Sequence, residues 1–294
     1  MPSLRQSLMN IFNRPSWRAG GRLFRRETLA DAGLKPRRAG PPTGPLAVIA
    51  HVGAVGILLA RTMSLMFTAK TDRGESRRMA HRYANGSTGF VVVAMAFVGM
   101  IMVYQSTEQL ARAIGDTQLV GATFLKLLVR VLGPTVMGML LACRVGAGIA
   151  AEIGAMAVTD QLDAMRMCAA DPIEALMVPR LRGAVVASLS LVVIGAAAAI
   201  LAGLATGVVC FAMSPATYWN LSLIGFSDVI QGVAKALVYG VAVPIVSGAC
   251  GLAARGGARG VGQATTDAVV GSSFAIVALD SLISMISHLA TGGA

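Results

Sequence analysis

Six apolar stretches, each close to the length of a membrane-spanning helix, most constrain what this chain can fold into. A helix needs about 20 apolar residues to cross the hydrocarbon core of a bilayer. The chain is 55% hydrophobic and only 13% charged, which is outside the usual balance of a soluble domain. The sequence therefore predicts an all-α, multi-pass integral membrane protein. The stretches are residues 45–67, 88–105, 119–143, 184–213, 229–254 and 268–290.

Basic residues flank the first stretch on both sides. Arginines and lysines are frequent in residues 1–44, and five more follow between residues 70 and 82. Cytoplasmic segments are rich in Lys and Arg, so both ends of residues 45–67 are predicted to lie on the cytoplasmic side. His51 and Arg61 within the stretch also suit a helix that lies in the membrane interface. We predict an interfacial helix followed by five transmembrane helices. The basic tail, residues 1–44, is either solvated or forms an amphipathic helix on anionic lipid.

The remaining loops indicate the orientation. The predicted outer connections, residues 106–118 and 214–228, carry Arg112 as their only basic residue. This asymmetry predicts that the N-terminus lies inside and the C-terminus outside, whereas six full crossings would place the arginine-bearing loops outside. The predicted inner connections carry Arg144, Arg166, Arg180, Arg182, Arg255 and Arg259.

Several ionisable residues are predicted at membrane depth. Arg130, Lys235 and Asp280 fall inside apolar stretches, and Lys126 lies near an outer end. A buried charge in lipid costs at least about 2.5 kcal/mol, so each should face a partner or a cavity. Asp280 paired with Arg130 or Lys235 would avoid that cost. A structural ion pair or snorkelling to the interface is the simpler interpretation, and a role toward substrate or protons is the alternative.

Small residues recur at four-residue spacing in two of the predicted helices. One row consists of Ala142, Gly146, Ala150 and Gly154, and the other contains Ala236, Gly240 and Gly248. Such rows allow the backbones of helices in lipid to approach closely. They are predicted to pack helices within one subunit, with a subunit interface as the alternative.

The sequence contains no pattern typical of catalysis, metal binding or nucleotide binding. The histidines His51, His81 and His288 are far apart, and the four cysteines show no metal-ligand spacing. The segment "GGARGVG" at 256–262 lacks the spacing of a phosphate-binding loop. We therefore expect no metal site, no cofactor and no ATP site on this chain. The basic residues lie in the tail and loops rather than among aromatics, so no nucleic-acid partner is predicted either.

A polar segment follows the apolar run that ends near Gly154. From Thr159 the chain reads "TDQLDAMRM", with no turn signal before it. Thr159 or Asp160 is predicted to cap a short amphipathic helix at about 158–170, with Leu162, Met165 and Ala169 on one face and Asp163 one turn before Arg166. By pattern alone it lies on the headgroups, and a docking surface for a partner is the alternative.

Four motifs from Arg130 onward are similar to those of the YrbE/MlaE permeases of ABC-type lipid transporters associated with MCE proteins. The resemblance is much weaker before Thr88, and the tail has no counterpart. The matching stretches are "RVLGPTVMGMLLACRVGAGIAAEIGAM" (130–156), "TDQLDAM" (159–165), "DPIEALMVPRLRG" (171–183), and "GQATTDAVVGSS" with "ALDSLI" (262–283).

The resemblance implies a permease domain over residues 45–294 with an N-terminal interfacial helix and five spans. It implies that two permease subunits pair around a lipid path and that a periplasmic ring of MCE proteins continues the path. A cytoplasmic ABC ATPase would bind ATP and Mg²⁺ on its own chain. The resemblance also implies that the segment around 159–165 is the coupling helix that contacts this ATPase. Its predicted contact residues are Thr159, Asp160, Gln161, Leu162, Asp163, Ala164, Met165 and Arg166.

The chain departs from the family pattern at two places. Val131 stands where the family has a glutamate after the arginine, and Asp160 and Gln161 replace a pair of glutamates in the coupling motif. The second change removes one negative charge from the ATPase contact. Together with the long tail, these departures favour an actinobacterial B-type subunit that pairs with a different A-type chain.

The function predicted from the sequence is therefore a permease subunit in the bacterial inner membrane. It would move lipid, fatty acid or sterol, with import favoured. One alternative is a secondary transporter or channel that works alone. It would need an intramembrane carboxylate relay, for which only Asp280 is available. Another is a structural scaffold for a periplasmic assembly.

Overall fold

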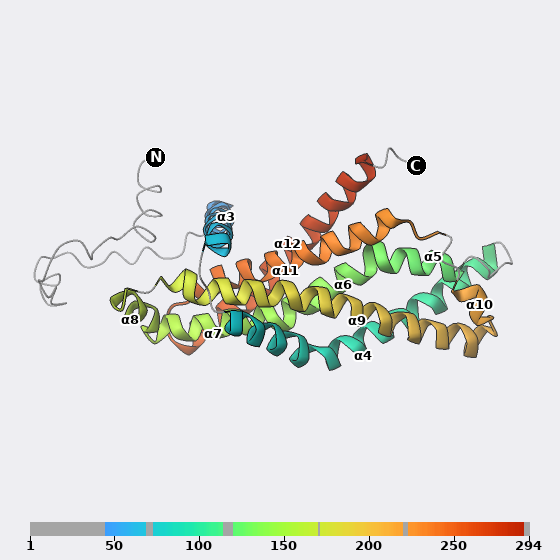
Figure 1. Ribbon diagram of the computed structural model, residues 1–294, viewed down its shortest axis with the longest axis horizontal. Coiled ribbons are helices and arrows are strands. Elements are labelled where there is room, and N and C mark those ends of the chain that lie inside the picture. The colour runs from blue at the N-terminus through green and yellow to red at the C-terminus, as the bar shows by residue number, and fades with distance from the viewer. Residues whose placement is uncertain (1–44, 69–72, 114–119, 170, 220–222, 291–294) are drawn as a thin grey trace, which may run out of the picture. The chain divides into compact units, whose positions relative to one another are not determined.

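Helices are the only regular elements in the described part of the chain, residues 45–68, 73–113, 120–169, 171–219 and 223–290 of a computed structural model (Figure 1). The basic tail at 1–44 lies outside the described residues. Ala50–Ala294 is one compact unit of the chain, and it contains α3 from Ala50 onward and all later helices. The α-helices are α3 (Pro45–Thr68), α4 (Arg73–Ala113), α5 (Val120–Leu127), α6 (Gly133–Leu141), α7 (Ala147–Val158), α8 (Gln161–Met167), α9 (Val178–Phe211), α10 (Pro215–Tyr218), α11 (Phe226–Leu252) and α12 (Ala258–Ala290).

Five helical runs in the described residues are long and apolar enough to cross a membrane. Each extends beyond the corresponding apolar stretch of the sequence at one end at least, because polar residues such as Glu, Gln and Arg continue a helix readily once it has started. The predicted fold class is confirmed: five candidate spans and one shorter apolar helix before them. The orientation across the membrane stays a prediction. The runs are Gly74–Leu110, Val120–Val158, Ile173–Phe211, Phe226–Leu252 and Ala258–Leu289.

Two of these runs contain π-helical turns. In the second run η1 (Leu128–Leu132) separates α5 from α6, and η2 (Ala142–Gly146) separates α6 from α7. The fourth run contains Pro244 within α11. Pro134 explains η1, because proline has no N–H and its ring clashes with the preceding turn. Instead the N–H of Gly133 reaches back to the carbonyl of Leu128, which widens the turn. A third π-helical turn, η3 (Ile173–Met177), opens the run that contains α9.

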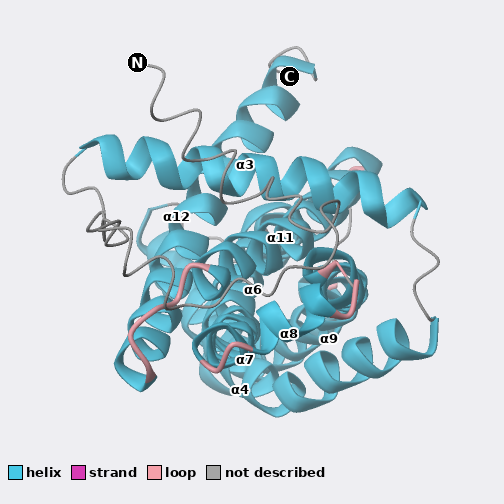
Figure 2. Ribbon diagram, turned by 90° about the vertical axis from the view of Figure 1, so that its left-hand side faces the viewer, coloured by secondary structure: helices cyan, strands magenta, loops and turns pink. Residues whose placement is uncertain are grey.

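The long helices α4 and α9 lie against each other along most of their length. Small residues allow this approach: a Cβ on Gly99 of α4 would collide with the backbone of Ala199 in α9. Figure 2 shows α4 and α9 in one bundle with α6, α7 and α11, viewed down the long axis of the bundle. The pair therefore forms a close, apolar contact.

The small-residue row on η2 and α7 faces α11 of the same subunit. A Cβ on Gly146 would lie 2.8 Å from the Ser247 hydroxyl, and one on Gly154 would lie 3.3 Å from Cβ of Ala254. Ala142 and Ala150 are completely buried. This row packs helices within one subunit, which is the first of the two interpretations of the sequence.

Helix α3, from Ala50 onward, runs across the long axis of the other helices, since it is seen end-on in Figure 1 and from the side in Figure 2. Leu58 and Thr62 on one of its faces are buried. Its Arg61 forms an ion pair of 2.7 Å with Asp171, which precedes α9. Arg182 at the start of α9 donates a hydrogen bond to the carbonyl of Met66. These contacts hold α3 at the same end of the bundle as α8.

The short helix α10 closes the opposite end. Tyr218 is completely buried, its hydroxyl donates to the carbonyl of Ile200 at 3.1 Å, and its ring contacts Phe124. Burial raises the pKa of Tyr218 above its usual range, so the phenol stays a neutral donor.

Candidate functional site

A cluster of polar side chains joins α6, α11 and α12 inside the bundle. Lys235 Nζ lies 2.7 Å from Asp280 Oδ1, and the Lys235 side chain is completely buried. The hydroxyls of Tyr239 and Thr135 donate to the same carboxylate oxygen at 2.7 and 2.9 Å. The carboxylate thus has one cation and two neutral donors. This arrangement offsets the desolvation of both charges, as a buried ion pair requires.

Arg130 lies apart from this cluster. Its guanidinium contacts Asp228 Oδ1 at 3.4 Å, at the first turn of α11. The other oxygen of Asp228 accepts from the N–H of Gly225 at 3.0 Å. Of the two partners considered for Asp280, the structure shows Lys235. Asp228 was not predicted as a partner from the sequence because it fell in a predicted outer connection.

The polar contact between α11 and α12 continues on both sides of the ion pair. Toward the C-terminus of α12, Lys235 donates to Ser284 at 2.9 Å, and Ser287 donates to Gln231 at 3.0 Å. In the other direction the hydroxyls of Ser247 and Ser272 lie 3.4 Å apart. Spaced serines gave no signal in the sequence, because each is unremarkable alone and only the pairing of two helices brings them together.

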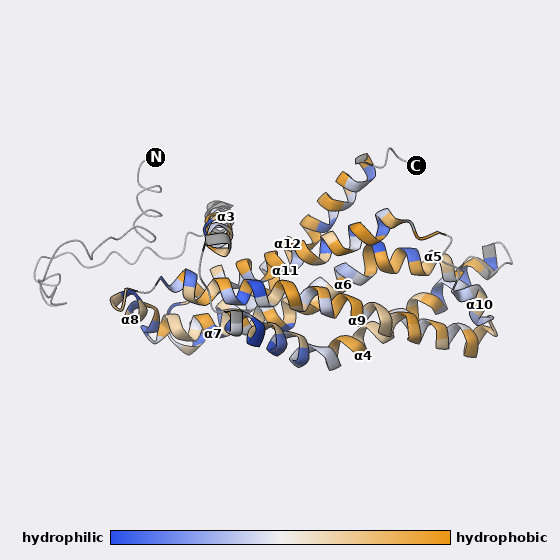
Figure 3. Cartoon of the chain, viewed as in Figure 1, coloured by the Kyte–Doolittle hydropathy of each residue, from blue (hydrophilic) through white to orange (hydrophobic). Residues whose placement is uncertain are grey.

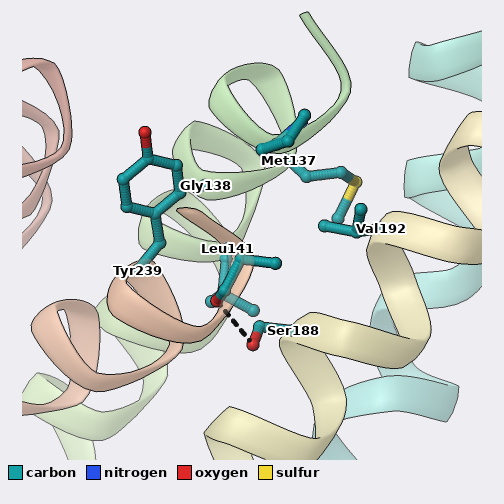
Figure 4. A pocket seen from close by; sticks show the side chains of 8 residues that line it. Met137, Gly138, Leu141, Ser188, Val192 and Tyr239 are labelled. Atoms are coloured by element: carbon teal, nitrogen blue, oxygen red, sulfur yellow. Dashed lines mark hydrogen bonds between the residues drawn. The ribbon is translucent and has the colours of Figure 1, made fainter. Parts of the chain in front are cut away.

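A small cavity lies beside the ion pair, between α6, α9 and α11. Figure 4 shows Met137, Leu141, Val192 and Tyr239 around it, with Ser188 hydrogen-bonded to the carbonyl of Ala236 at 3.0 Å. Its volume of about 10 Å³ leaves room for about one water molecule. This cavity is therefore too small for a lipid chain.

Helix α8 protrudes at the opposite end from α10. Of its seven residues only Leu162 is buried, and Met167 is 84% exposed. The predicted pair of Asp163 and Arg166 is present, with Nη1 and Oδ1 2.7 Å apart. This short helix between two spans therefore leaves most of its side chains exposed.

The helix predicted at about 158–170 is shorter, Gln161–Met167, and the predictions of a side-chain cap and of the face shared by Ala169 are wrong. The chain turns sharply between α7 and α8, with Asp160 in the left-handed region at φ 59°. No side chain caps α8, because the Thr159 hydroxyl donates back to the carbonyl of Ala155 at 2.8 Å instead. Ala169 lies beyond α8 and has φ 60°, so it does not share a face with Leu162. Asp tolerates the left-handed conformation better than most residues, which allows a turn without glycine.

A second ionic cluster lies near this end of the bundle. Glu152 on α7 accepts from Arg82 of α4 at 2.8 Å and from Arg180 of α9 at 3.2 Å. Arg180 is only 4% exposed and also donates to the carbonyl of Leu176. One carboxylate therefore ties three helices together. In the sequence these arginines indicate only the orientation of the chain in the membrane.

No metal site is present among the described side chains: no three His, Cys, Asp or Glu residues lie close enough together to hold an ion. Most charged groups inside the bundle are paired, whereas Nε of Arg180 and the amide nitrogen of Gln231 are buried without a hydrogen-bond partner among the described residues. Their arrangement suits positioning and transmission of movement rather than bond-breaking chemistry.

The known proteins that this chain resembles in sequence are membrane permeases. The sequence profile of the permease MlaE family matches residues 77–286. A "Probable ABC transporter permease protein" of Rickettsia typhi is 39% identical over 65% of this chain and 75% of its own length. A protein of the same name from Synechocystis is 36% identical over 70% of this chain and 79% of its own.

A further relative carries a more specific name. The intermembrane phospholipid transport system permease protein MlaE of Haemophilus influenzae is 31% identical over 67% of this chain and 76% of its own length. The family profile covers three of the long helical runs completely and nearly all of the first and the last. The resemblance seen in the sequence motifs is confirmed: this chain is a multi-pass membrane protein of the MlaE permease family.

Proposed function

We propose that this chain is the membrane-spanning subunit of an ABC-type lipid transporter in the bacterial inner membrane. It moves a phospholipid, fatty acid or sterol, with import as the favoured direction. A separate ATPase chain binds ATP and Mg²⁺ and supplies the energy. This chain itself carries out no hydrolysis.

The observation that carries this proposal is the exposure of α8. A seven-residue helix whose apolar anchor is Leu162 alone leaves Asp163, Arg166 and Met167 open to the solvent. The turn at Asp160 aims α8 away from the axis of α7. Such a helix enters a groove of a partner and passes its movement to α7 and α9, the helices before and after it. Residues 159–166 are therefore the proposed ATPase contact.

The polar contact between α11 and α12 supports a role in transport. Lys235 and Asp280 form a direct ion pair, and hydroxyl groups rather than interlocked apolar side chains surround it. Hydroxyls readily exchange partners. The Asp280 side chain retains 19% exposure, so the cluster reaches the surface of the bundle. Charged groups held within a membrane protein commonly mark the path of a substrate. We propose that Arg130, Lys235 and Asp280 border the lipid path.

The proposed path needs a second permease subunit. The cavity beside the ion pair is too small for a lipid chain, and α12 exposes Phe274, Met285 and Leu289. Exposed apolar residues on a spanning helix face either lipid or another subunit. We propose that this side of the bundle meets a second, different permease chain, and that a periplasmic ring of MCE proteins receives or delivers the lipid.

The weakened coupling motif favours two different permease chains. With Asp160 and Gln161 in place of two glutamates, this subunit offers the ATPase one negative charge fewer. A partner subunit with the complete motif would bind the ATPase more tightly. The two halves of the transporter would then contribute unequally to coupling.

Co-purification tests the proposal. The Asp163→Arg variant reverses the central charge of α8 and is expected to lose the ATPase when the complex is purified from membranes. Glu75→Arg is the matched control, because Glu75 is an exposed acid in the first turn of α4 at the same end of the bundle. Recovery of the ATPase with both variants, together with unchanged transport, would contradict the docking role of α8.

A further inference from the structure

The first turns of α4 carry a basic surface that neither the ion-pair cluster nor α8 uses. An open hollow of about 470 Å³ lies against Gly74, Arg77, Arg78, His81 and Arg82. Figure 3 shows these first turns as strongly hydrophilic and the following turns of α4 as apolar. Arg82 is paired with Glu152 at 2.8 Å. Among the ion pairs formed by described residues, none involves Arg77, Arg78 or His81.

The buried positions of α4 define its outward face. They recur every four residues, and four residues turn a helix by about 40° more than a full circle, so the buried stripe winds slowly around α4. The exposed face winds with it on the opposite side. The buried positions are Tyr83, Ser87, Val91, Met95, Gly99, Val103 and Thr107.

Farther along this outward face, beyond the exposed Asn85 and Gly86, the basic surface gives way to an apolar one. Arg77, Arg78 and His81 occupy the exposed side of the first turns, and Phe90, Val93 and Phe97 occupy the exposed side of the next ones. Phe97 is 58% exposed. His81 and Phe90 are separated by roughly 14 Å along the helix axis. One face of one helix thus presents cations at the membrane surface and large apolar side chains just below it.

We propose that this face of α4 binds an anionic phospholipid. The phosphate contacts Arg77, Arg78 and His81 in the hollow, and the acyl chains lie along Phe90, Val93 and Phe97. Charge complementarity favours this ligand, because basic pockets at the ends of spanning helices attract anionic headgroups. A free anion would leave the apolar strip without a contact. The site lies outside the ion-pair cluster of α11 and α12 and does not rest on coupling to an ATPase.

A lipid bound at this site is expected to affect the packing of α4 on α9. Tyr83, next to Arg82, is buried, and a Cβ on Gly183 at the start of α9 would lie 2.7 Å from Cβ of Met79. A lipid bound on the outward side of these turns therefore contacts the same helical segment that packs on α9. Occupancy is expected to stabilise the junction of α4, α7 and α9, where Glu152 joins Arg82 and Arg180.

Native mass spectrometry of the full chain, in the complex in which it purifies, tests the site. Phosphatidylglycerol and phosphatidylcholine are added to separate detergent solutions. We expect phosphatidylglycerol to bind more tightly. The variant Arg77→Gln with Arg78→Gln is expected to bind phosphatidylglycerol about 30-fold more weakly, which corresponds to about 2 kcal/mol at roughly 1 kcal/mol for each arginine.

Matched variants separate this site from a general effect of charge. Arg255→Gln with Arg259→Gln removes two exposed arginines, one between α11 and α12 and one in the first turn of α12, and is expected to retain the lipid. Arg77→Lys with Arg78→Lys keeps the charge and is expected to retain most of the binding, which also shows that the altered turns still fold. Equal loss in the Arg255/Arg259 variant, or none in the Arg77/Arg78 variant, would overturn the proposal.

A final arm distinguishes a lipid from a free anion. Inorganic phosphate, at the same concentration as phosphatidylglycerol, is expected to leave the lipid bound because it lacks acyl chains for Phe90 and Phe97. Complete displacement by inorganic phosphate would show a simple anion site instead. Retention of phosphatidylcholine as strongly as phosphatidylglycerol would also contradict the proposed role of the arginines.

Discussion

The contact between α4 and α9 differs in kind from the contact between α11 and α12. The first is apolar and so close that Gly99 leaves no room for a methyl group against Ala199. The second contains an ion pair and several hydroxyl contacts, with Lys235 and Asp280 at its centre. In lipid, both kinds of contact stabilise helix pairs, the first by packing and the second by hydrogen bonds.

This difference separates a scaffold from a contact that can rearrange. Interlocked backbones must move apart before they can slide, because packed interiors do not deform gradually. Polar side chains in a membrane can exchange one partner for another, although none can be left without a partner. We therefore interpret α4 and α9 as the rigid pair and the α11–α12 contact as the functional one.

Removing the cation of the ion pair is expected to have the largest effect on stability. Lys235→Met leaves the Asp280 carboxylate with two hydroxyl donors and no cation, and breaking a buried pair in this way costs about 3–5 kcal/mol. Thermal unfolding in detergent measures the loss. Lys126→Met is the control, because Lys126 is half-buried near a helix end and no ion pair of the described residues includes it. Equal losses for the two variants would contradict the importance of the pair.

A single methyl group tests the close packing of α4 on α9. Gly99→Ala places a Cβ against the backbone of Ala199 and is expected to destabilise the protein by about 1–3 kcal/mol. Gly89→Ala on the same helix meets no atom within 4 Å and should be neutral or raise stability by up to about 1 kcal/mol. Unfolding temperatures of the two proteins provide the comparison. An unchanged unfolding temperature for Gly99→Ala would show that the contact between α4 and α9 is not rigid.

The link between α3 and the segment before α9 is expected to contribute less. Arg61 and Asp171 are both partly exposed, so the free energy of their 2.7 Å ion pair is at most about 1 kcal/mol. A double-mutant cycle with Arg61→Gln and Asp171→Asn measures this coupling energy. A value of several kcal/mol would place α3 among the rigid parts of the fold.

The smallest effect is predicted at the far end of α4. Arg112 and Glu108 form an exposed pair four residues apart, and Arg112→Gln should lower stability by only about 0.3–0.5 kcal/mol. High salt should abolish even this difference, because exposed charges are screened. A larger loss of stability in Arg112→Gln than in Gly99→Ala would contradict this ranking.

The sequence was sufficient to predict the helical membrane fold because spanning helices follow from local composition. Apolar runs such as 229–254 are visible without tertiary information, and the paired basic flanks of 45–67 distinguish α3 from a span. The turn at Asp160 could not be predicted, since it depends on a left-handed residue that is not glycine. The π-helical turn η1 likewise depends on how the chain accommodates Pro134 after folding.

The candidate site was predictable only in part, for a related reason. An isolated charge in an apolar stretch is conspicuous, so Arg130, Lys235 and Asp280 stood out in the sequence. Their partners did not, because Asp228 lies at a helix end and Ser284 is an ordinary serine. Pairing is a property of two helices, and no pattern within one helix records it.

ATP-driven lipid transfer in reconstituted vesicles tests most directly whether the α11–α12 contact carries the function. Asp280→Asn keeps the size of the side chain and removes its charge, and Gly99→Ala weakens the scaffold alone. Per assembled complex, we predict that Asp280→Asn lowers the transfer rate at least tenfold, which corresponds to about 1.4 kcal/mol, while Gly99→Ala retains the normal rate. Normal transfer by an assembled Asp280→Asn complex would contradict the account.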